Sequence, residues 1–222
     1  MGIYYEDDWW KIFCGDCRKY LGMFADPRLS EWHVDTIITD PPWPGFDRLG
    51  MTKEESIKLF SEVAQYFLIA KRVIIVLRHD VDPRFLVSVP AELPFFRIQI
   101  LPYVMPGYIG RKLGGDEIAY CFGEPLPSVP GKRVIPGYAP KAQPQQRPNN
   151  GHPCSRALSH FRWLVEWWSL PGETILDPFM GSGVTLRAAR ASGRKGIGME
   201  IEEKYCKLTV ASLNNPEMIL EV

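Results

Sequence analysis

Residues 174–191 read TILDPFMGSGVTLRAARA, an order of residue types that predicts a strand, a glycine-containing loop and a helix. The apolar run Thr174 to Leu176 leads into the loop DPFMGSG (177–183), and helical residues follow from about Val184 to Ala191. The N-terminus of a helix presents unpaired N–H groups to an anion, and glycines let a ligand approach the backbone. The stretch therefore predicts a ligand-binding turn in an α/β fold.

This loop differs from the fingerprint of dinucleotide-binding proteins, which needs glycine or alanine at position 186, where this chain has Leu186. The phosphate-binding pattern GxxxxGK is also absent from the sequence. A second predicted strand, Lys195 to Met199, ends at Glu200, about 20 residues beyond the loop, where an acid can accept hydrogen bonds from ribose hydroxyls. The pattern indicates a ligand that is a nucleoside with a carboxylate tail.

A further strand-like run, Val34 to Thr39, is followed directly by Asp40-Pro41-Pro42-Trp43. Prolines fix the backbone and leave their carbonyls free to accept hydrogen bonds. We expect the Asp40 carboxylate and the Pro41 carbonyl to hold a planar amine, as on adenine or cytosine. The indole of Trp43, expected to be exposed, would stack on the base, which contributes about 1 to 3 kcal/mol. Taken alone, the four residues fit a strand that ends in a stiff Pro-Pro turn equally well.

The remaining pattern alternates strands and helices. Further strands are expected at 11–13, 72–77, 95–101 and 117–122, and helices at about 18–24, 52–70, 158–168 and 203–213. Thr52 and Glu55 have the spacing of a capping box. Because open α/β sheets bind ligands at the carboxyl ends of their strands, Asp40 and Asp177 are expected to lie close together.

Four segments, at 12–17, 40–43, 150–156 and 177–200, together resemble one family in their order and spacing. The family is the bacterial and phage amino-group DNA methyltransferases, in which S-adenosylmethionine is the methyl donor and the catalytic motif precedes the cofactor motif (the β-class order). The resemblance implies catalytic roles for Asp40, Pro41, Pro42 and Trp43. It implies cofactor contacts by Asp16, Cys17, Asp40, His152, Pro153, Ser155, Asp177, Pro178, Phe179, Gly181, Ser182, Gly183, Glu200 and Ile201.

The resemblance also implies a fold. It is a Rossmann-like class I methyltransferase fold, circularly permuted, with a mostly parallel seven-stranded sheet in the order 3-2-1-4-5-7-6 and helices on both faces. One catalytic domain would span residues 1–222, and the last helix would end close to the first strand. The sequence departs from the family where Arg156 and Ala157 replace lysine and proline, and where Val184 replaces threonine. Thr185 can still form hydrogen bonds to the loop.

Charge is distributed unevenly in a chain whose formal net charge is zero. Residues 101–163 contain eight Lys or Arg against three acids, and the Pro-rich stretch at about 124–150 has a composition that suits a loop rather than a core. The family inserts its target-recognition region here, which implies double-stranded DNA as the partner. A solvated basic loop without a partner has the same composition. The expected DNA contacts are Arg111, Lys112, Lys132, Arg133, Lys141 and Arg147.

The sequence shows no export signal and no apolar run that could span a bilayer, so we expect a cytoplasmic protein. The five cysteines are then expected to be reduced thiols. Cys14 and Cys17 form a CxxC pair without a second pair or a nearby histidine, so no metal is expected.

The expected reaction is direct in-line transfer of a methyl group to N6 of adenine in a flipped-out base, because a stacked amine cannot reach the donor. Aspartate at 40 and tryptophan at 43 favour adenine over N4 of cytosine. An RNA or protein amide methyltransferase and a non-catalytic methyltransferase-like subunit are competing hypotheses. A homodimer is also expected, and a place in restriction-modification or in a phage follows from the resemblance alone.

Overall fold

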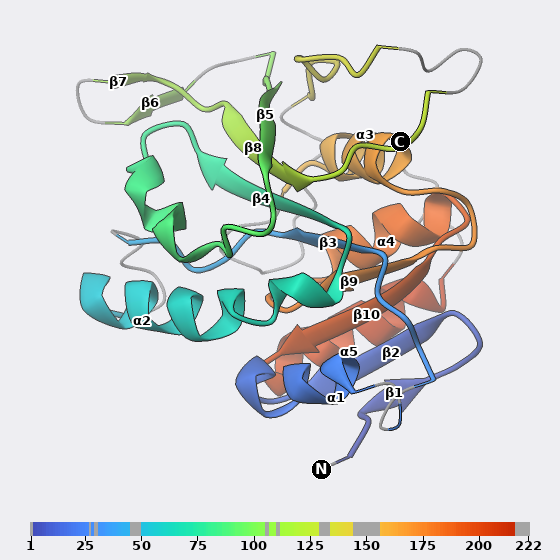
Figure 1. Cartoon of the computed structure of the whole chain (residues 1–222). Helices are drawn as coiled ribbons and strands as arrows, with labels where there is room; N and C mark the ends of the chain where they lie inside the picture. Colours follow the sequence, from blue (N-terminus) through green and yellow to red (C-terminus); the bar gives the residue numbers. More distant parts are fainter. Residues whose placement is uncertain are drawn as a thin grey trace.

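The computed structural model describes residues 2–26, 28, 31–44, 50–104, 107–109, 112–128, 134–143 and 156–215, with the backbone alone for 107–109 and 112–114. Its main sheet contains β1 Tyr5–Glu6, β2 Trp10–Cys14, β3 Thr36–Thr39, β4 Arg72–Arg78, β5 Phe95–Leu101, β8 Glu117–Gly123, β9 Thr174–Asp177 and β10 Lys195–Glu200. The strand order is β1-β2-β10-β9-β3-β4-β8-β5 (Figure 1). A separate hairpin joins β6 Gly107–Ile109 to β7 Lys112–Gly114.

The expected order 3-2-1-4-5-7-6, which numbers the strands as in the unpermuted fold, corresponds to β2-β10-β9-β3-β4-β8-β5 and is confirmed. The expected count of seven strands is wrong. Strands β2, β10, β9, β3 and β4 are parallel, β8 is antiparallel to β4, and β5 is antiparallel to β8. The eighth strand, β1, adds an antiparallel pair to the outer edge of β2. Its two residues are too few to show a periodic pattern, so the sequence did not reveal it.

Helices cover both faces of the sheet (Figure 1). They are α1 Leu21–Ala25, α2 Lys53–Ala64, α3 Leu158–Trp168, α4 Val184–Ala191 and α5 Glu203–Leu213. One hydrophobic core packs the sheet against α3, α4 and α5, and a second packs it against α1 and α2. The central strand β4 contributes Ile74 and Val76 to the first core and Val73, Ile75 and Leu77 to the second, so it is buried on both faces as its apolar run predicted.

Helix α2 begins with the predicted capping box but ends earlier than expected. The Thr52 hydroxyl accepts from the Glu55 N–H, and the Glu55 carboxylate accepts from the Thr52 N–H. The helix stops at Ala64 instead of residue 70, and a 3-10 turn, η3 Phe67–Ile69, follows it. This tighter turn buries Phe67 in the core and reverses the chain in time to start β4.

The Pro-rich segment is only partly the loop that its composition predicted. Residues 134–143 form a strap along the outer strand β5, with single bridges from Tyr138 to Ile100 and from Ala142 to Tyr103. Ala139 and Ala142, which belong to this strap, are buried. Small side chains therefore let part of this segment pack against the core despite its many prolines. No helix among the described residues is long and apolar enough to cross a membrane.

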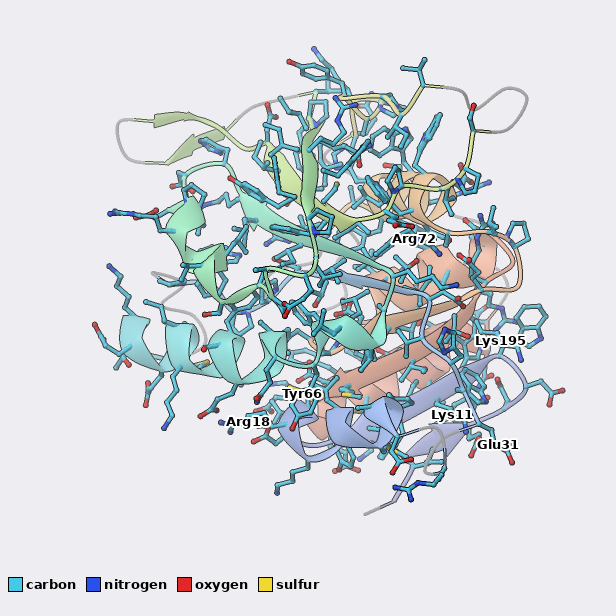
Figure 2. All side chains as sticks on the ribbon, in the orientation of Figure 1. Lys11, Arg18, Glu31, Tyr66, Arg72 and Lys195 are labelled. Carbon is cyan, nitrogen blue, oxygen red and sulfur yellow. The ribbon has the colours of Figure 1, made fainter. Side chains whose placement is uncertain are left out.

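The amino ends of the central strands are tied together by Arg72, labelled in Figure 2. Its Nε donates to the Thr36 hydroxyl at 3.1 Å and its Nη2 to Glu173 Oε2 at 2.7 Å. At the β1 edge of the sheet, the Tyr5 hydroxyl donates to Oδ1 of Asn214, the residue that follows α5, at 3.1 Å. The last helix thus finishes beside the first strands, as a circular permutation requires.

Replacing Gly196 tests the close approach of β10 to Trp10. An added Cβ at this position would lie 2.5 Å from Trp10 Cζ3, so Gly196→Ala should lower the free energy of unfolding by about 1 to 3 kcal/mol. Urea unfolding measures the change. The control is Gly22→Ala in α1, where an added Cβ would meet its nearest neighbour at 3.9 Å and should not destabilise the protein. Equal effects of the two substitutions would contradict this packing.

Candidate active site

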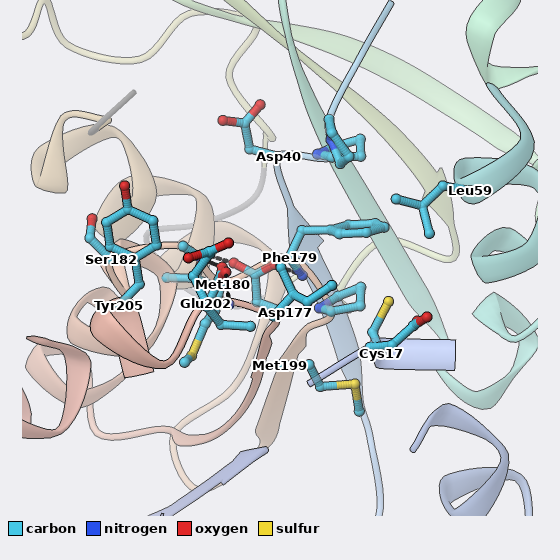
Figure 3. A pocket seen from close by; sticks show the side chains of 18 of the residues that line it. Cys17, Asp40, Leu59, Asp177, Phe179, Met180, Ser182, Met199, Glu202 and Tyr205 are labelled. Carbon is cyan, nitrogen blue, oxygen red and sulfur yellow. Dashed lines mark hydrogen bonds between the residues drawn. The ribbon is translucent and has the colours of Figure 1, made fainter. Parts of the chain in front are cut away.

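A cavity of about 680 Å³ lies at the carboxyl edge of the parallel strands. Residues that follow β2, β3, β9 and β10 line it, and part of α2 closes one wall. Figure 3 shows Asp40 and Asp177 at this cavity, with Tyr205 on one side and Cys17 and Leu59 on the other. Its size suits a small-molecule ligand, and its place is the one where open α/β sheets bind ligands.

Asp177 is the buried centre of the site. Its carboxylate accepts from the Thr39 hydroxyl at 2.7 Å, the Thr185 hydroxyl at 2.5 Å and the Phe179 N–H at 3.0 Å. Burial raises the pKa of Asp177 to about 6, against the lowering effect of these three hydrogen bonds. The bond from Thr39 joins β3 to β9, so the predicted proximity of Asp40 and Asp177 is confirmed.

The glycine loop after Asp177 is held against the end of β10. The Gly181 N–H donates to Glu200 Oε2 at 3.0 Å, and the Glu202 N–H donates to Glu200 Oε1 at 2.8 Å. Burial raises the pKa of Glu200, and these backbone donors oppose the shift. The carboxylate is therefore fixed at the cavity wall, where the sequence placed a partner for ribose hydroxyls.

The two loop glycines have different roles. Both adopt positive φ angles, 52° at Gly181 and 79° at Gly183. Gly181 lines the cavity, together with Pro178, Phe179, Ser182 and Ile201 from the predicted set. Gly183 is the N-cap of α4 and is not among the lining residues; an added Cβ there would lie 2.5 Å from Thr209 Cγ2. Its glycine is therefore explained by packing against α5 and by the turn into the helix.

Asp16 and Cys17 form the opposite wall. Asp16 caps the 3-10 turn η1 Cys17–Lys19, and its Oδ2 accepts from Arg18 Nη2 at 2.5 Å. The Arg18 guanidinium also pairs with Glu62 of α2 at 2.5 Å, so it links this wall to the helix. Burial raises the pKa of the Cys17 thiol to about 12, which keeps it protonated and makes it a wall residue rather than a nucleophile.

The tetrapeptide after β3 lines the same cavity, but Trp43 is not the exposed indole that the sequence suggested. Only 4% of Trp43 is exposed, and the Arg78 guanidinium lies over its ring at 4.8 Å from the centroid. Trp43 still lines the cavity beside Asp40, Pro41 and Pro42. Arg78, the last residue of β4, therefore packs on the indole and fixes the plane of its ring, which was expected to be exposed.

Asp40 has a partner that the sequence analysis missed. Arg156 Nε donates to Asp40 Oδ2 at 2.6 Å and Arg156 Nη2 to Asp40 Oδ1 at 3.1 Å. Arg156 Nη1 donates to Glu117 Oε1 at 2.7 Å, and the Tyr103 hydroxyl donates to Glu117 Oε2 at 3.0 Å. The one available signal was Glu117, an acid that opens an otherwise apolar strand.

Arg156 is one of the eight basic residues counted in 101–163, but it is buried within the protein and so is not available to DNA. Of the predicted DNA contacts, Lys141 is exposed and Lys112 is described by its backbone alone, in β7. Arg111, Lys132, Arg133 and Arg147 lie outside the described residues, as do the predicted cofactor contacts His152, Pro153 and Ser155.

Comparison with known proteins places this arrangement among methylases. A family model described as "DNA methylase" matches residues 132–211. The chain is 30% identical over 209 residues to the Escherichia coli K12 protein named "Putative methylase YubD", covering 86% of this chain and 84% of that one. It is 29% identical over 109 residues to the "DNA adenine methyltransferase YhdJ" of the same organism, covering 48% of this chain and 37% of that one.

Solved structures share the fold at lower sequence identity. The crystal structure of the M1.HpyAVI-SAM complex matches with a TM-score of 0.69 at 20% identity, covering 93% of this chain and all of that one. The PvuII DNA methyltransferase, described as cytosine-N4-specific, matches with a TM-score of 0.72 at 14% identity, covering 98% of this chain and 92% of that one. Both matches cover more than nine tenths of this chain.

The raised pKa of Asp177 predicts a pH-dependent stability. The folded protein binds a proton at about pH 6 and the unfolded chain at about pH 4, so the free energy of unfolding falls as pH rises through this window. Relative to Asp177→Asn, the wild type should lose roughly 2 kcal/mol between pH 4.5 and pH 7, as measured by urea unfolding.

The control for this measurement is Asp82→Asn. Arg84 lowers the pKa of Asp82 to about 2, so its titration lies below the tested range. The stability difference between this variant and the wild type should be the same at pH 4.5 and pH 7. A pH-independent difference for Asp177→Asn as well would show that Asp177 does not titrate as a buried acid.

Proposed function

Because the chain belongs to the family of amino-group (N6 and N4) DNA methyltransferases, we propose that it methylates N6 of adenine in DNA. That the protein is a DNA methyltransferase follows from the family. The observation that carries the proposal is the meeting of three strand ends in one cavity: Asp40 follows β3, the glycine loop follows β9, and Glu200 ends β10. An amine held at Asp40 would lie in the cavity that also holds the nucleoside.

The cofactor is S-adenosylmethionine, and the residues at the cavity suit its parts. Glu200 is a fixed acceptor for ribose hydroxyls, and the start of α4 offers helix N–H groups to a carboxylate. Met180 and Phe179 add apolar surface beside Asp177. When bound, the cofactor supplies an electrophilic methyl group, and no covalent intermediate with the protein is needed.

The protein's part in the reaction is to present the amine. The Asp40 carboxylate and the Pro41 carbonyl would each accept a hydrogen bond from one N–H of the amine. These two hydrogen bonds would orient the nitrogen lone pair. As the new N–C bond formed and the S–C bond of the donor broke to leave a neutral thioether, positive charge would build on the nitrogen, which would then release one proton to solvent; a fixed carboxylate stabilises that charge. Holding both reactants in line supplies much of the rate acceleration, and the base must leave the duplex to reach the cavity.

The choice of adenine rests on residues 40 and 43, where aspartate and tryptophan stand. The partial match to YhdJ, named a DNA adenine methyltransferase, supports this choice. The second candidate is N4 of cytosine, favoured by the structural match to the PvuII enzyme. Both targets present a planar exocyclic amine to the same acceptors, so the chemistry at Asp40 is common to the two.

Further parts of the proposal concern the partner. Duplex DNA would lie over the basic segment that includes Lys112, Lys132, Arg133 and Lys141, within a single catalytic domain. The proposal also includes a homodimeric protein with a cytoplasmic location.

The base is identified by incubating the protein with labelled S-adenosylmethionine and unmethylated DNA, followed by nucleoside mass spectrometry. The expected product is N6-methyladenine. Detection of N4-methylcytosine alone would replace adenine by cytosine, and label in RNA alone would contradict a DNA substrate.

The role of Asp40 is tested by Asp40→Ala. Loss of the carboxylate should reduce methyl transfer by about 100-fold or more, since an electrostatic contact of this kind typically supplies that much. The control is Asp82→Ala, a surface carboxylate on the turn after β4, which should leave transfer unchanged. Transfer by Asp40→Ala at the wild-type rate would remove Asp40 from the mechanism.

A further inference from the structure

Arg156 lies between two carboxylates that come from different parts of the fold. It forms a two-point contact with Asp40 at the end of β3, at 2.6 and 3.1 Å, and a 2.7 Å contact with Glu117 at the start of β8. The residue itself stands just before α3. The contact therefore links the expected catalytic loop to the antiparallel strand β8 and to the start of α3.

Asp40 and Arg156 line the cavity, and the cluster continues from there through Glu117 into the protein interior. Exposure is 1% for Glu117 and 7% for Arg156. Buried charges are costly unless they are paired and hydrogen-bonded, and removal of one partner leaves the other uncompensated. Glu117 meets this requirement on both sides, because its second oxygen accepts from Tyr103. Burial of an acid that two donors hold costs free energy. The presentation of an amine by Asp40 does not by itself require such a group.

The geometry fixes the direction of the Asp40 carboxylate. A guanidinium that binds both oxygens of a carboxylate holds its plane, which a single flexible ammonium cannot do. Asp40 lines the cavity through which the amine would approach, so its remaining acceptor positions are the ones available there. Arg156 thus determines where the carboxylate points.

The second carboxylate holds the guanidinium. Glu117 Oε1 accepts from Arg156 Nη1 at 2.7 Å while Nε and Nη2 donate to Asp40, so one guanidinium is shared between two carboxylates. Arg156 thus neutralises Asp40 less fully than it would with Asp40 as its single acceptor. Glu117 therefore fixes the position of Arg156, and Arg156 fixes the orientation of Asp40.

We propose that Arg156 and Glu117 are positioning residues for methyl transfer: Arg156 aims the Asp40 carboxylate at the target amine, and Glu117 holds the Arg156 guanidinium in place. This inference rests on the proposed function, because it assumes that Asp40 holds the amine. It assigns neither residue a contact with the base or with the methyl donor.

The test compares Arg156→Lys and Glu117→Gln in single-turnover methyl transfer to DNA at saturating S-adenosylmethionine. Arg156→Lys keeps the charge and loses the two-point contact, whereas Glu117→Gln keeps the shape and loses the charge. Both variants should slow transfer by about 10- to 100-fold, the usual effect of a misplaced catalytic group. Calorimetry should give a dissociation constant for S-adenosylmethionine within about twofold of wild type, and circular dichroism should show folded protein.

The matched control is a second Arg–Glu pair on the neighbouring helix. Arg162→Lys and Glu166→Gln alter a partly exposed pair at 3.0 Å in α3, and both should keep the wild-type rate. If Arg156→Lys does not fold, Glu117→Gln, which has nearly the same shape as the native residue, decides the matter alone.

Two results would overturn the inference while leaving the proposed function in place. One is methyl transfer within about twofold of wild type in the folded variants. The other is a slower reaction that is fully explained by weaker S-adenosylmethionine binding, which would make the pair part of the cofactor site. A wild-type protein that transfers no methyl group to DNA, or an Asp40→Ala variant that remains active, would instead remove the proposed function, and the inference would fall with it.

Discussion

The hydrogen bond from the Thr39 hydroxyl to the buried Asp177 carboxylate is the contact on which the site depends. It crosses between two neighbouring parallel strands that are far apart in the sequence. Thr39 is the last residue of β3 and directly precedes Asp40, while Asp177 is the last residue of β9 and directly precedes the glycine loop. A hydrogen bond to a buried charge contributes about 1.5 to 3 kcal/mol, so the two halves of the site hold one fixed relation.

The rest of the site extends outward from this anchor. The other Asp177 oxygen accepts from Thr185, which sets the first turn of α4, and the loop between them reaches across to Glu200 at the end of β10. On the other side, Arg156 and Glu117 hold Asp40 from β8 and the start of α3. Each polar group at the cavity is thus fixed by a partner from a different element, which suits a site that must align two reactants before they react.

Local sequence patterns predicted most of the fold because they report local physics. The capping box at Thr52 fixed the start of α2, and the run 72–77 was recognisable as a strand buried on both faces. The sequence did not predict the partners of Asp40 and Trp43. Arg156 lies 116 residues from Asp40, and no spacing rule connects them; Arg78 lies over Trp43 only because β3 and β4 are neighbours. Such contacts depend on how the elements pack.

Under the proposed function, one cavity would hold the methyl donor at Glu200 and the amine at Asp40, as separable functions. Titration calorimetry with S-adenosylmethionine on Glu200→Gln, Asp40→Ala and the surface control Glu203→Gln tests this separation. Glu200→Gln should bind at least about tenfold more weakly, since a hydrogen bond to a charged group contributes about 1.5 to 3 kcal/mol. Asp40→Ala and Glu203→Gln should bind within about threefold of wild type, which would limit Asp40 to the amine although the family resemblance also implies a cofactor contact there. Unchanged binding by Glu200→Gln, or loss of binding by Asp40→Ala, would contradict the separation.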